Sequence, residues 1–534
     1  MTTATDTEKP KIPELPPNWD RCHAYMETKR RYCRQQRRGT YMYCGNHSHL
    51  LHASNDSNSN GGNDSNGDSQ TKERKRIPCP VDQSHMIWED QVAKHIPICP
   101  KTKKRKREEA QNYFQKDINN GGFGDICTAI TTKDHDKAED EMEWAKQLAL
   151  RILEVHQKLF STEANATTNT PQDLTFEEVH NCIEMRDYSA QELSAGIADG
   201  FQAHRIRSGG ARHIPQLASL IGHLRAIGVL PSAPSDIKAT TEKPLLLIDM
   251  GAGRGMLGLA AAGVSRSHGL ETHLMMVERA GTRSKAEKIL RNLGGDKHGS
   301  TSSASSGSYL SFDNVQWSRI KCDLSHVNLK VLLEKPELKD CKVVIIAKHL
   351  CGVGSDLALK AVEPVKERVD ACIFATCCHG VCNWCGYVGR DYLRRHMDTE
   401  KTSFGPKEFD LLRQWCAGSV AIQPRISEDG QNNGGAEAED DADEGEAEHS
   451  LPTESTRPSR SNISAVVESL DLKCGIAGLG RACQRLIDYG RLQYLRHNLF
   501  DGIDVANVRI FHYVPPQTTP QNALLVATRM KAVQ

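Results

Sequence analysis

The chain has 534 residues, a formal net charge of zero and 38% hydrophobic residues, a length that suggests two to four structural units. No apolar run reaches the roughly 18 residues that a membrane span needs, and no signal-peptide core stands near the start, which excludes membrane-spanning and secreted classes. We therefore expect a nuclear or cytoplasmic protein, whose 18 cysteines favour metal binding over disulfides.

The charges are segregated along the chain although they cancel in total. Basic clusters lie early, at 72–76 and 101–107, and an acidic run lies late, at 437–448. A basic segment that also carries cysteines favours an anionic partner such as nucleic acid. Solubilising or nuclear-targeting tails would have the same composition, so the charge runs alone leave both interpretations open.

A first set of metal ligands is expected within 18–50, after a polar and proline-rich start. The set contains Cys22, Cys33, Cys44 and His47. Three thiolates and one imidazole complete a tetrahedral zinc site, and so short a segment needs a metal for stability. His47 is the preferred fourth ligand, with His23 and His49 as alternatives.

A second set of ligands is expected within 75–101, after a disordered linker at 51–74 that is mostly Asn, Ser, Gly and Asp. The set contains Cys79, His85, His95 and Cys99. Its spacing resembles the CHHC-type zinc finger of RNA-processing proteins. Two small zinc modules in tandem are typical of binding to a polymer or a partner.

The region between these modules and the main domain is expected to be partly flexible. Residues 102–136 are predicted to be a basic, flexible linker, and 137–235 a helical region with amphipathic helices over 138–160 and 212–224. The remaining 236–534 carries the pattern of a doubly wound α/β domain.

The strongest local pattern in that domain is a strand followed by a glycine turn. Four apolar residues before Asp249 fit a buried parallel strand, and Gly251, Gly253 and Gly255 form a turn that lets a ligand approach the backbone. A helix is expected to follow over about 254–262. The acid before a Gly-x-Gly-x-Gly turn would repel a pyrophosphate but suits the cationic amino-acid end of S-adenosylmethionine.

Further strands are expected at 273–278, 315–322, 343–348 and 371–376, with helices between them, which implies a parallel sheet. A closing hairpin is expected at 505–513 and 523–528. The predicted fold class is therefore α/β, a Rossmann-like methyltransferase with a mostly parallel seven-stranded sheet and helices on both faces. Insertions at 294–308 and 427–461 are expected to be disordered surface loops.

Acidic residues stand at three successive strand ends. Besides Asp249, these are Glu278, placed to accept hydrogen bonds from ribose hydroxyls, and Asp323, placed to meet the adenine amine. Ligands of open parallel sheets bind at such ends. We therefore assign the three acids and the three glycines to S-adenosylmethionine binding.

The tips of the fourth and fifth strands carry the candidate catalytic groups. The Asn/Asp-Pro-Pro-Tyr/Phe motif of exocyclic amine methylation is absent. A ribose hydroxyl needs a base or a nearby cation before it can attack a methyl group. The candidates are Lys348 first and then His349 and His379. The alternative is that these side chains only hold the loops in place. An alternative use of this region is a third metal site made of Cys377, Cys378, Cys382 and Cys385.

Together these motifs resemble the eukaryotic tRNA ribose methyltransferases of the acceptor stem. The resemblance covers about 22–99 and 212–528 and is carried by the paired fingers and by segments 248–255, 277–279, 283–285, 348–352, 377–379 and 485–491. It implies transfer of a methyl group from S-adenosylmethionine to the 2′-hydroxyl of the fourth nucleotide of the tRNA acceptor stem. The two insertions and Val381 depart from the family pattern, which leaves the subset of tRNAs open.

Two other functions are weighed beside this one. An RNA cytosine C5-methyltransferase would use Cys351 with Cys377 or Cys378 to attack the base, but the usual Pro-Cys at the fourth tip is missing. A non-catalytic zinc-finger scaffold that binds RNA would not need acids at three successive strand ends.

Overall fold

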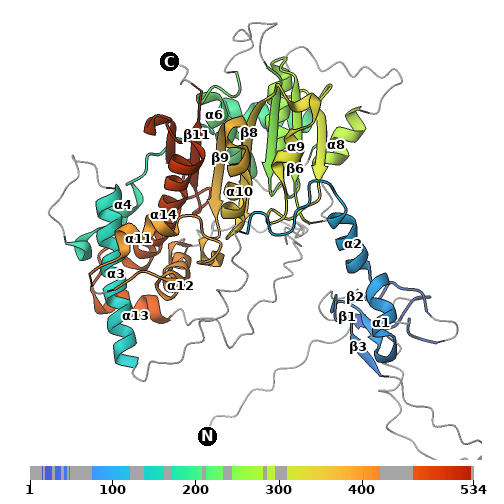
Figure 1. Ribbon diagram of the computed structural model, residues 1–534, viewed down its shortest axis with the longest axis horizontal. Helices are drawn as coiled ribbons and strands as arrows, with labels where there is room; N and C mark the ends of the chain where they lie inside the picture. The colour runs from blue at the N-terminus through green and yellow to red at the C-terminus, as the bar shows by residue number, and fades with distance from the viewer. Residues whose placement is uncertain are drawn as a thin grey trace, which may run out of the picture. The chain divides into compact units, whose positions relative to one another are not determined.

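The computed structural model describes residues 15, 19–26, 31–37, 41–44, 47, 75–120, 138–160, 170–206, 212–231, 243–280, 285–294, 309–400, 402–420 and 461–530. The loops expected at 51–74, 294–308 and 427–461 lie outside these residues, apart from end residues of the last two. Figure 1 shows the two compact units into which the chain divides, Met1–Ala110 and Gln111–Gln534. Among the described helices, none has the length and apolar composition needed to cross a membrane.

The first unit contains two small antiparallel hairpins. Strand β1 (Tyr25–Met26) pairs with β2 (Arg31–Tyr32), and β3 (Arg76–Pro78) pairs with β4 (Met86–Trp88). The short helices η3 (Glu89–Gln91), α1 (Val92–His95) and η4 (Ile96–Ile98) and the longer α2 (Pro100–Glu109) complete it. Among the described residues of this unit, the buried ones are mainly the cysteines of the two expected metal sets, with only small apolar clusters around them.

The first part of the linker expected at 102–136 is ordered instead. Helix α2 starts with Pro100 at a position where the missing N–H costs nothing, and Arg105 pairs with Glu109 one turn later. Residues 111–120 then belong to the second unit, where the Asn119 side chain donates to the carbonyls of Leu324 and Val327 at 2.7 and 2.8 Å. The run of charged residues did not predict this helix, because its cations point to solvent along one continuous helical segment and show no apolar period.

The second unit is built on a seven-stranded sheet in the order β10-β11-β9-β8-β5-β6-β7, whose five strands from β9 to β7 run parallel. The parallel strands are β5 (Leu245–Met250), β6 (Thr272–Val277), β7 (Gln316–Ile320), β8 (Lys342–Cys351) and β9 (Val369–Cys377). The antiparallel β11 (Ala523–Thr528) joins β9 to β10 (Val508–His512). The α/β fold class predicted from the sequence is confirmed.

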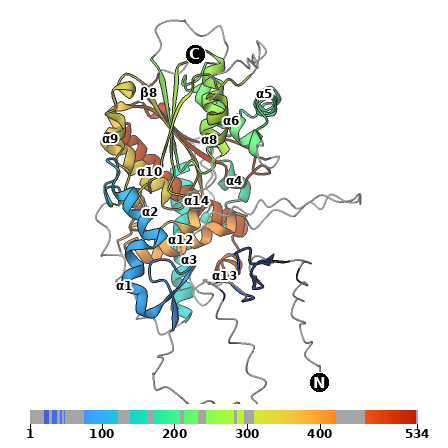
Figure 2. The same cartoon turned by 90° about the vertical axis from the view of Figure 1, so that its right-hand side faces the viewer.

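Helices cover both faces of the sheet, as Figure 2 shows in side view. Alternate residues of β5 face opposite cores, because side chains along a strand point to alternate sides. One core contains α5 (Gln191–Ala203), α6 (His213–Ala226), α7 (Met256–Ser267) and α8 (Lys285–Gly294). The other contains α9 (Leu329–Leu333), α10 (Gly354–Val362) and the end of α14 (Gly475–Tyr494).

A third core joins helices that lie far apart in the sequence. It contains α3 (Ala138–Phe160), α4 (Phe176–His180), α11 (Arg390–Met397), α12 (Pro406–Trp415), α13 (Ser461–Ser469) and most of α14. The apolar stripe of α3 is thus buried against α14, more than 300 residues later. The helical region expected at 137–235 is therefore part of the same compact unit as the sheet.

Several element ends differ from the sequence expectation. Strand β8 continues three residues beyond 348, and the first strand of the hairpin starts at Val508 because Val505–Asn507 forms a short helix. The helix after the glycine turn starts at Met256 and ends at Ser267. The remaining short helices of the described residues are Pro171–Asp173, Pro336–Leu338, Glu363–Arg368, His379–Val381, Cys416–Val420 and the π-helical Leu495–Leu499.

Candidate active site and metal sites

The glycine turn lies between β5 and α7, and two of its glycines have different tasks. A Cβ on Gly251 would come within 2.1 Å of Leu350 Cδ2, so this position must be small for the turn to pack against the tip of β8. A Cβ on Gly253, whose φ is 51°, would meet nothing within 4 Å. Open space therefore lies directly beside the Gly253 backbone, where a ligand can approach it. Gly255 ends the turn as the left-handed residue before α7.

Glu278 follows β6, and its side chain joins the glycine turn to the loop after β6. Its Oε2 accepts a hydrogen bond from the Gly253 N–H at 2.9 Å, and its Oε1 accepts one from the Ala280 N–H at 2.7 Å. Each carboxylate oxygen can accept a further bond, and the side chain is only half-buried. Glu278 can therefore accept hydroxyl donors from a ligand beside Gly253.

Asp323 lies beyond the end of β7. Its Oδ1 accepts bonds from the Ser325 N–H at 2.9 Å and the Ser325 hydroxyl at 2.8 Å, and its Oδ2 is 3.5 Å from Arg279 Nη1. Although burial opposes ionisation, these bonds hold the pKa of Asp323 below its ordinary value. A charged acceptor with spare lone pairs therefore stands where an adenine amine is expected.

Asp249 lies near the end of β5 and contacts the helix that follows the glycine turn. It is 2% exposed, and its Oδ2 accepts a hydrogen bond from the Gly258 N–H in the first turn of α7 at 3.1 Å. The first N–H groups of a helix lack partners, so a carboxylate at the end of β5 satisfies one of them. Burial raises the pKa of Asp249 to about 7. Asp249 therefore ties the end of β5 to the start of α7, and its assignment to S-adenosylmethionine binding stays a prediction.

Lys348 lies on β8, the strand next to β5. Burial lowers the pKa of its amine to about 8, an effect that the nearby Asp249 partly opposes. The strand is irregular at this point, because the register with β9 shifts between Lys348 and Leu350. His349, between them, is exposed and has a φ of 64°.

His379 lies after β9 and is only 2% exposed. Its Nε2 is 2.8 Å from Asp488 Oδ1, and its buried Nδ1 has no hydrogen-bond partner within the described part of the chain. The three candidate bases therefore differ in kind. Lys348 is half-buried with a lowered pKa, His349 is exposed, and His379 is buried and oriented by a carboxylate.

Asp488 and Arg491 of α14 connect the two strand tips, a role that the sequence reading did not assign. Besides His379, Asp488 accepts a bond from the Thr376 hydroxyl at 3.1 Å. Arg491 donates to the Gly352 carbonyl at 3.1 Å and to Asp356 Oδ2 at 2.8 Å. The signal available in the sequence was the presence of charged residues within an otherwise apolar helix.

The cysteines of the two tips form a group other than the one considered from the sequence. The thiols of Cys351, Cys377 and Cys378 lie within 4.8 Å of one another. The Cys382 sulfur instead accepts a bond from Arg491 Nη2 at 3.2 Å. The set of Cys377, Cys378, Cys382 and Cys385 is therefore not assembled, because the chain turns Cys382 toward α14.

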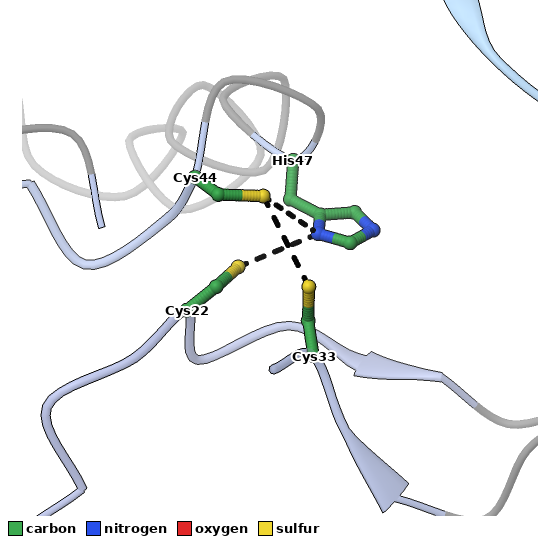
Figure 3. A group of neighbouring side chains, drawn as sticks. All are labelled: Cys22, Cys33, Cys44 and His47. Carbon is green, nitrogen blue, oxygen red and sulfur yellow. Dashed lines mark hydrogen bonds between the residues drawn. The ribbon is translucent and has the colours of Figure 1, made fainter. Parts of the chain in front are cut away.

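The first expected metal set is brought together in the first unit (Figure 3). The His47 Nδ1 atom lies 3.4 Å from Cys22 Sγ and 3.3 Å from Cys44 Sγ, and Cys33 Sγ lies 4.0 Å from Cys44 Sγ. A tetrahedral zinc ion would set two sulfurs about 3.8 Å apart and sulfur and nitrogen about 3.5 Å apart. These four residues therefore fit zinc, and His47 rather than His23 is the histidine of the group.

The second expected set is also assembled. Cys79 Sγ lies 3.9 Å from Cys99 Sγ, and His85 Nε2 lies 3.0 Å from His95 Nε2. Cys99 Sγ is 3.9 Å from His85 Nε2. Both cysteines are fully buried, although little apolar surface surrounds them. The donor set and its spacing again fit a tetrahedral zinc ion.

Comparison with known families gives three matches along the chain. The family model described as Methyltransferase TRM13 matches 215–528. A CCCH zinc finger in TRM13 protein matches 20–48, and a U11-48K-like CHHC zinc finger matches 76–100.

Similar proteins are found in distant eukaryotes. The tRNA:m(4)X modification enzyme TRM13 of Saccharomyces cerevisiae is 24% identical over 395 residues, which cover 70% of this chain and 72% of the yeast protein. The TRM13 homolog of Mus musculus is 23% identical over 95% of this chain and 94% of its own length. The Homo sapiens homolog is 22% identical over 98% and 97%.

Proposed function

Because the chain belongs to the TRM13 methyltransferase family, we propose that it is a tRNA ribose 2′-O-methyltransferase dependent on S-adenosylmethionine. It transfers the methyl group to the 2′-hydroxyl of the fourth nucleotide in the tRNA acceptor stem. The observation that carries the proposal lies at the carboxyl edge of the sheet. There, open space beside Gly253 adjoins Glu278, and Lys348 with its lowered pKa lies on the neighbouring strand tip.

The residues around Gly253 suit S-adenosylmethionine. Glu278 receives the ribose hydroxyls and Asp323 the adenine amine, since both acids keep free acceptor capacity. Gly251 and Gly255 shape the turn, and Asp249 keeps it in place through Gly258. When bound, the cofactor supplies an activated, electrophilic methyl group.

Lys348 acts as the base in this proposal. A ribose hydroxyl is a poor nucleophile until its proton is taken, and an amine with a pKa of about 8 is partly neutral at physiological pH. The substrate hydroxyl is held next to Lys348, which accepts its proton as the new bond forms. His349 and His379, the latter held by Asp488, are the next choices.

The two fingers are the tRNA-binding modules of this proposal, at 18–50 and 75–101, ahead of the catalytic domain at 236–534. Each holds one zinc ion through its four assembled ligands. Helix α2 carries the run of lysines and arginines directly after Cys99, so phosphates bound there would adjoin the second finger. The relatives named as tRNA modification enzymes support tRNA as the substrate, and we place the activity in the nucleus or the cytoplasm.

The proposal is tested by mapping methylated nucleotides in RNA from cells that lack the protein. The expected result is loss of the 2′-O-methyl group at the fourth acceptor-stem nucleotide, with other tRNA modifications unchanged. Loss of a 5-methylcytosine, with covalent trapping on a fluorinated cytosine analogue, would instead favour the C5-methyltransferase that uses Cys351 and Cys377 or Cys378. Unchanged methylation throughout would favour a scaffold that binds RNA.

A further inference from the structure

We propose that Cys351, Cys377 and Cys378 form a third metal site, which binds zinc at the tips of β8 and β9. Their three sulfur atoms all lie within 4.8 Å of one another, close enough for one metal ion to bind all three. This site is separate from the fingers, because its residues belong to the unit that contains the sheet. The proposal of this metal site does not depend on the proposed methyl transfer.

The backbone of β8 is distorted in the way that brings these thiols together. A regular register with β9 would continue from Lys348 opposite Ala375 to Cys351 opposite Cys378. The shift at His349 instead sets Cys351 opposite Cys377. A bulge of this kind re-aims the side chains that follow it. The distortion therefore aligns the exposed Cys351 with the buried Cys377.

The tip of β9 is distorted as well. Cys378 has a φ of 50°, a left-handed conformation that is unfavourable for a residue with a Cβ. Gly352 packs so closely on the β9 loop that a Cβ there would lie 2.5 Å from Val381 Cγ2 and 2.7 Å from its carbonyl oxygen. The two tips are thus held against each other, with left-handed residues at His349 in β8 and at Cys378 directly after β9. Strained residues of this kind gather at functional sites.

The chemistry of the cluster favours a soft metal ion. Three thiolates so close together repel one another unless a cation lies between them, and thiolates select zinc over magnesium or calcium. Cys351 is exposed and Cys378 half-buried, so the cluster is open to solvent on one side. A site with three protein ligands leaves the fourth position of a tetrahedral ion for water or a substrate oxygen.

Metal analysis of the full-length protein, purified under reducing conditions, tests the proposal. The wild type is expected to contain three zinc ions per chain, and the Cys351→Ala and Cys378→Ala variants two. Cys372→Ala is the matched control, because Cys372 lies on β9 with Cys377 but outside the cluster, and it should retain three. Two ions in the wild type, or three in both tip variants, would overturn the proposal.

A second measurement needs no variant, so misfolding cannot obscure it. When cobalt replaces zinc, the intensity of the thiolate-to-cobalt absorption grows with the number of cobalt–sulfur bonds. The fingers alone supply five thiolates, and the third site raises the number to eight. The account therefore predicts an absorption about 1.6 times that expected for the fingers alone, since all eight ligands are thiolates of tetrahedral sites. An intensity matching five bonds, or a disulfide within the cluster in the freshly purified protein, would contradict it.

Discussion

Replacing Lys348 by alanine should remove the pH dependence of methyl transfer, if this lysine is the base. Burial lowers the pKa of the amine from its ordinary 10.5 to about 8. The shift corresponds to about 3.4 kcal/mol in favour of the neutral form. At pH 7.5 about a quarter of the molecules then carry a neutral amine, against about one in a thousand for an exposed lysine.

The assay is a single-turnover measurement of methyl transfer at saturating tRNA and cofactor between pH 6.5 and 9.5. The wild-type rate should rise about 30-fold from pH 6.5 to pH 9 and then level off, following the neutral fraction of an amine with this pKa. Lys348→Ala should be slow and flat with pH. Lys360→Ala is the matched control, because burial also lowers the pKa of Lys360 but this residue lies on α10.

Two results would contradict the assignment of Lys348 as the base. A wild-type rate that does not change over this range would show that no group with a pKa near 8 is deprotonated in the reaction. A Lys348→Arg variant that keeps most of the activity would show that the side chain serves as a phosphate anchor, since arginine stays charged throughout. The base would then be sought at His349 or His379.

The remaining predictions concern the turn and the buried network. Burial raises the pKa of Asp249 from 3.8 to about 7, so the wild type loses stability as pH rises through this range. Asp249→Asn lacks this loss. The free energy of unfolding of the variant minus that of the wild type, measured by urea denaturation, should therefore increase by about 3 kcal/mol from pH 5 to pH 8. A difference that does not vary with pH would contradict this. Gly253→Ala should abolish cofactor binding in calorimetry, whereas Gly475→Ala, with a similar φ and equally open space, should bind normally. Equal affinities of these two variants for the cofactor would show that it does not bind beside Gly253. Asp488→Asn leaves buried arginines uncompensated and should cost about 3–5 kcal/mol in chemical denaturation, while the exposed Asp471→Asn should cost little. Similar stabilities of these two variants would show that the network does not depend on the charge of Asp488.

The elements that follow from local pattern could be predicted from the sequence. The apolar run of β5 and the period of α3 depend on neighbouring residues only, and both elements have nearly the expected bounds. The two finger sets were recognisable because their ligands lie within 26 residues of one another. Such features need no knowledge of how distant segments meet.

The details of the site depend on contacts between distant residues, and these could not be predicted. His379 pairs with Asp488, 109 residues later, which no local spacing reveals. The side chain of Asp249 turns toward α7 because an unpaired helix N–H lies there. Cys351 joins Cys377 only because β8 bulges at His349, a backbone irregularity with no sequence signature.

The proposed acceptor of the methyl group is the 2′-hydroxyl of the fourth tRNA nucleotide, and a chemically altered substrate shows whether this hydroxyl is used. A tRNA with a single 2′-deoxynucleotide at the fourth position keeps every base and nearly the same shape but lacks the proposed acceptor. The account predicts normal methyl transfer to the all-ribose tRNA and to tRNAs with the deoxynucleotide at the third or fifth position. It predicts no transfer when the deoxynucleotide is at the fourth. Methylation of that last tRNA at the normal rate would contradict the account.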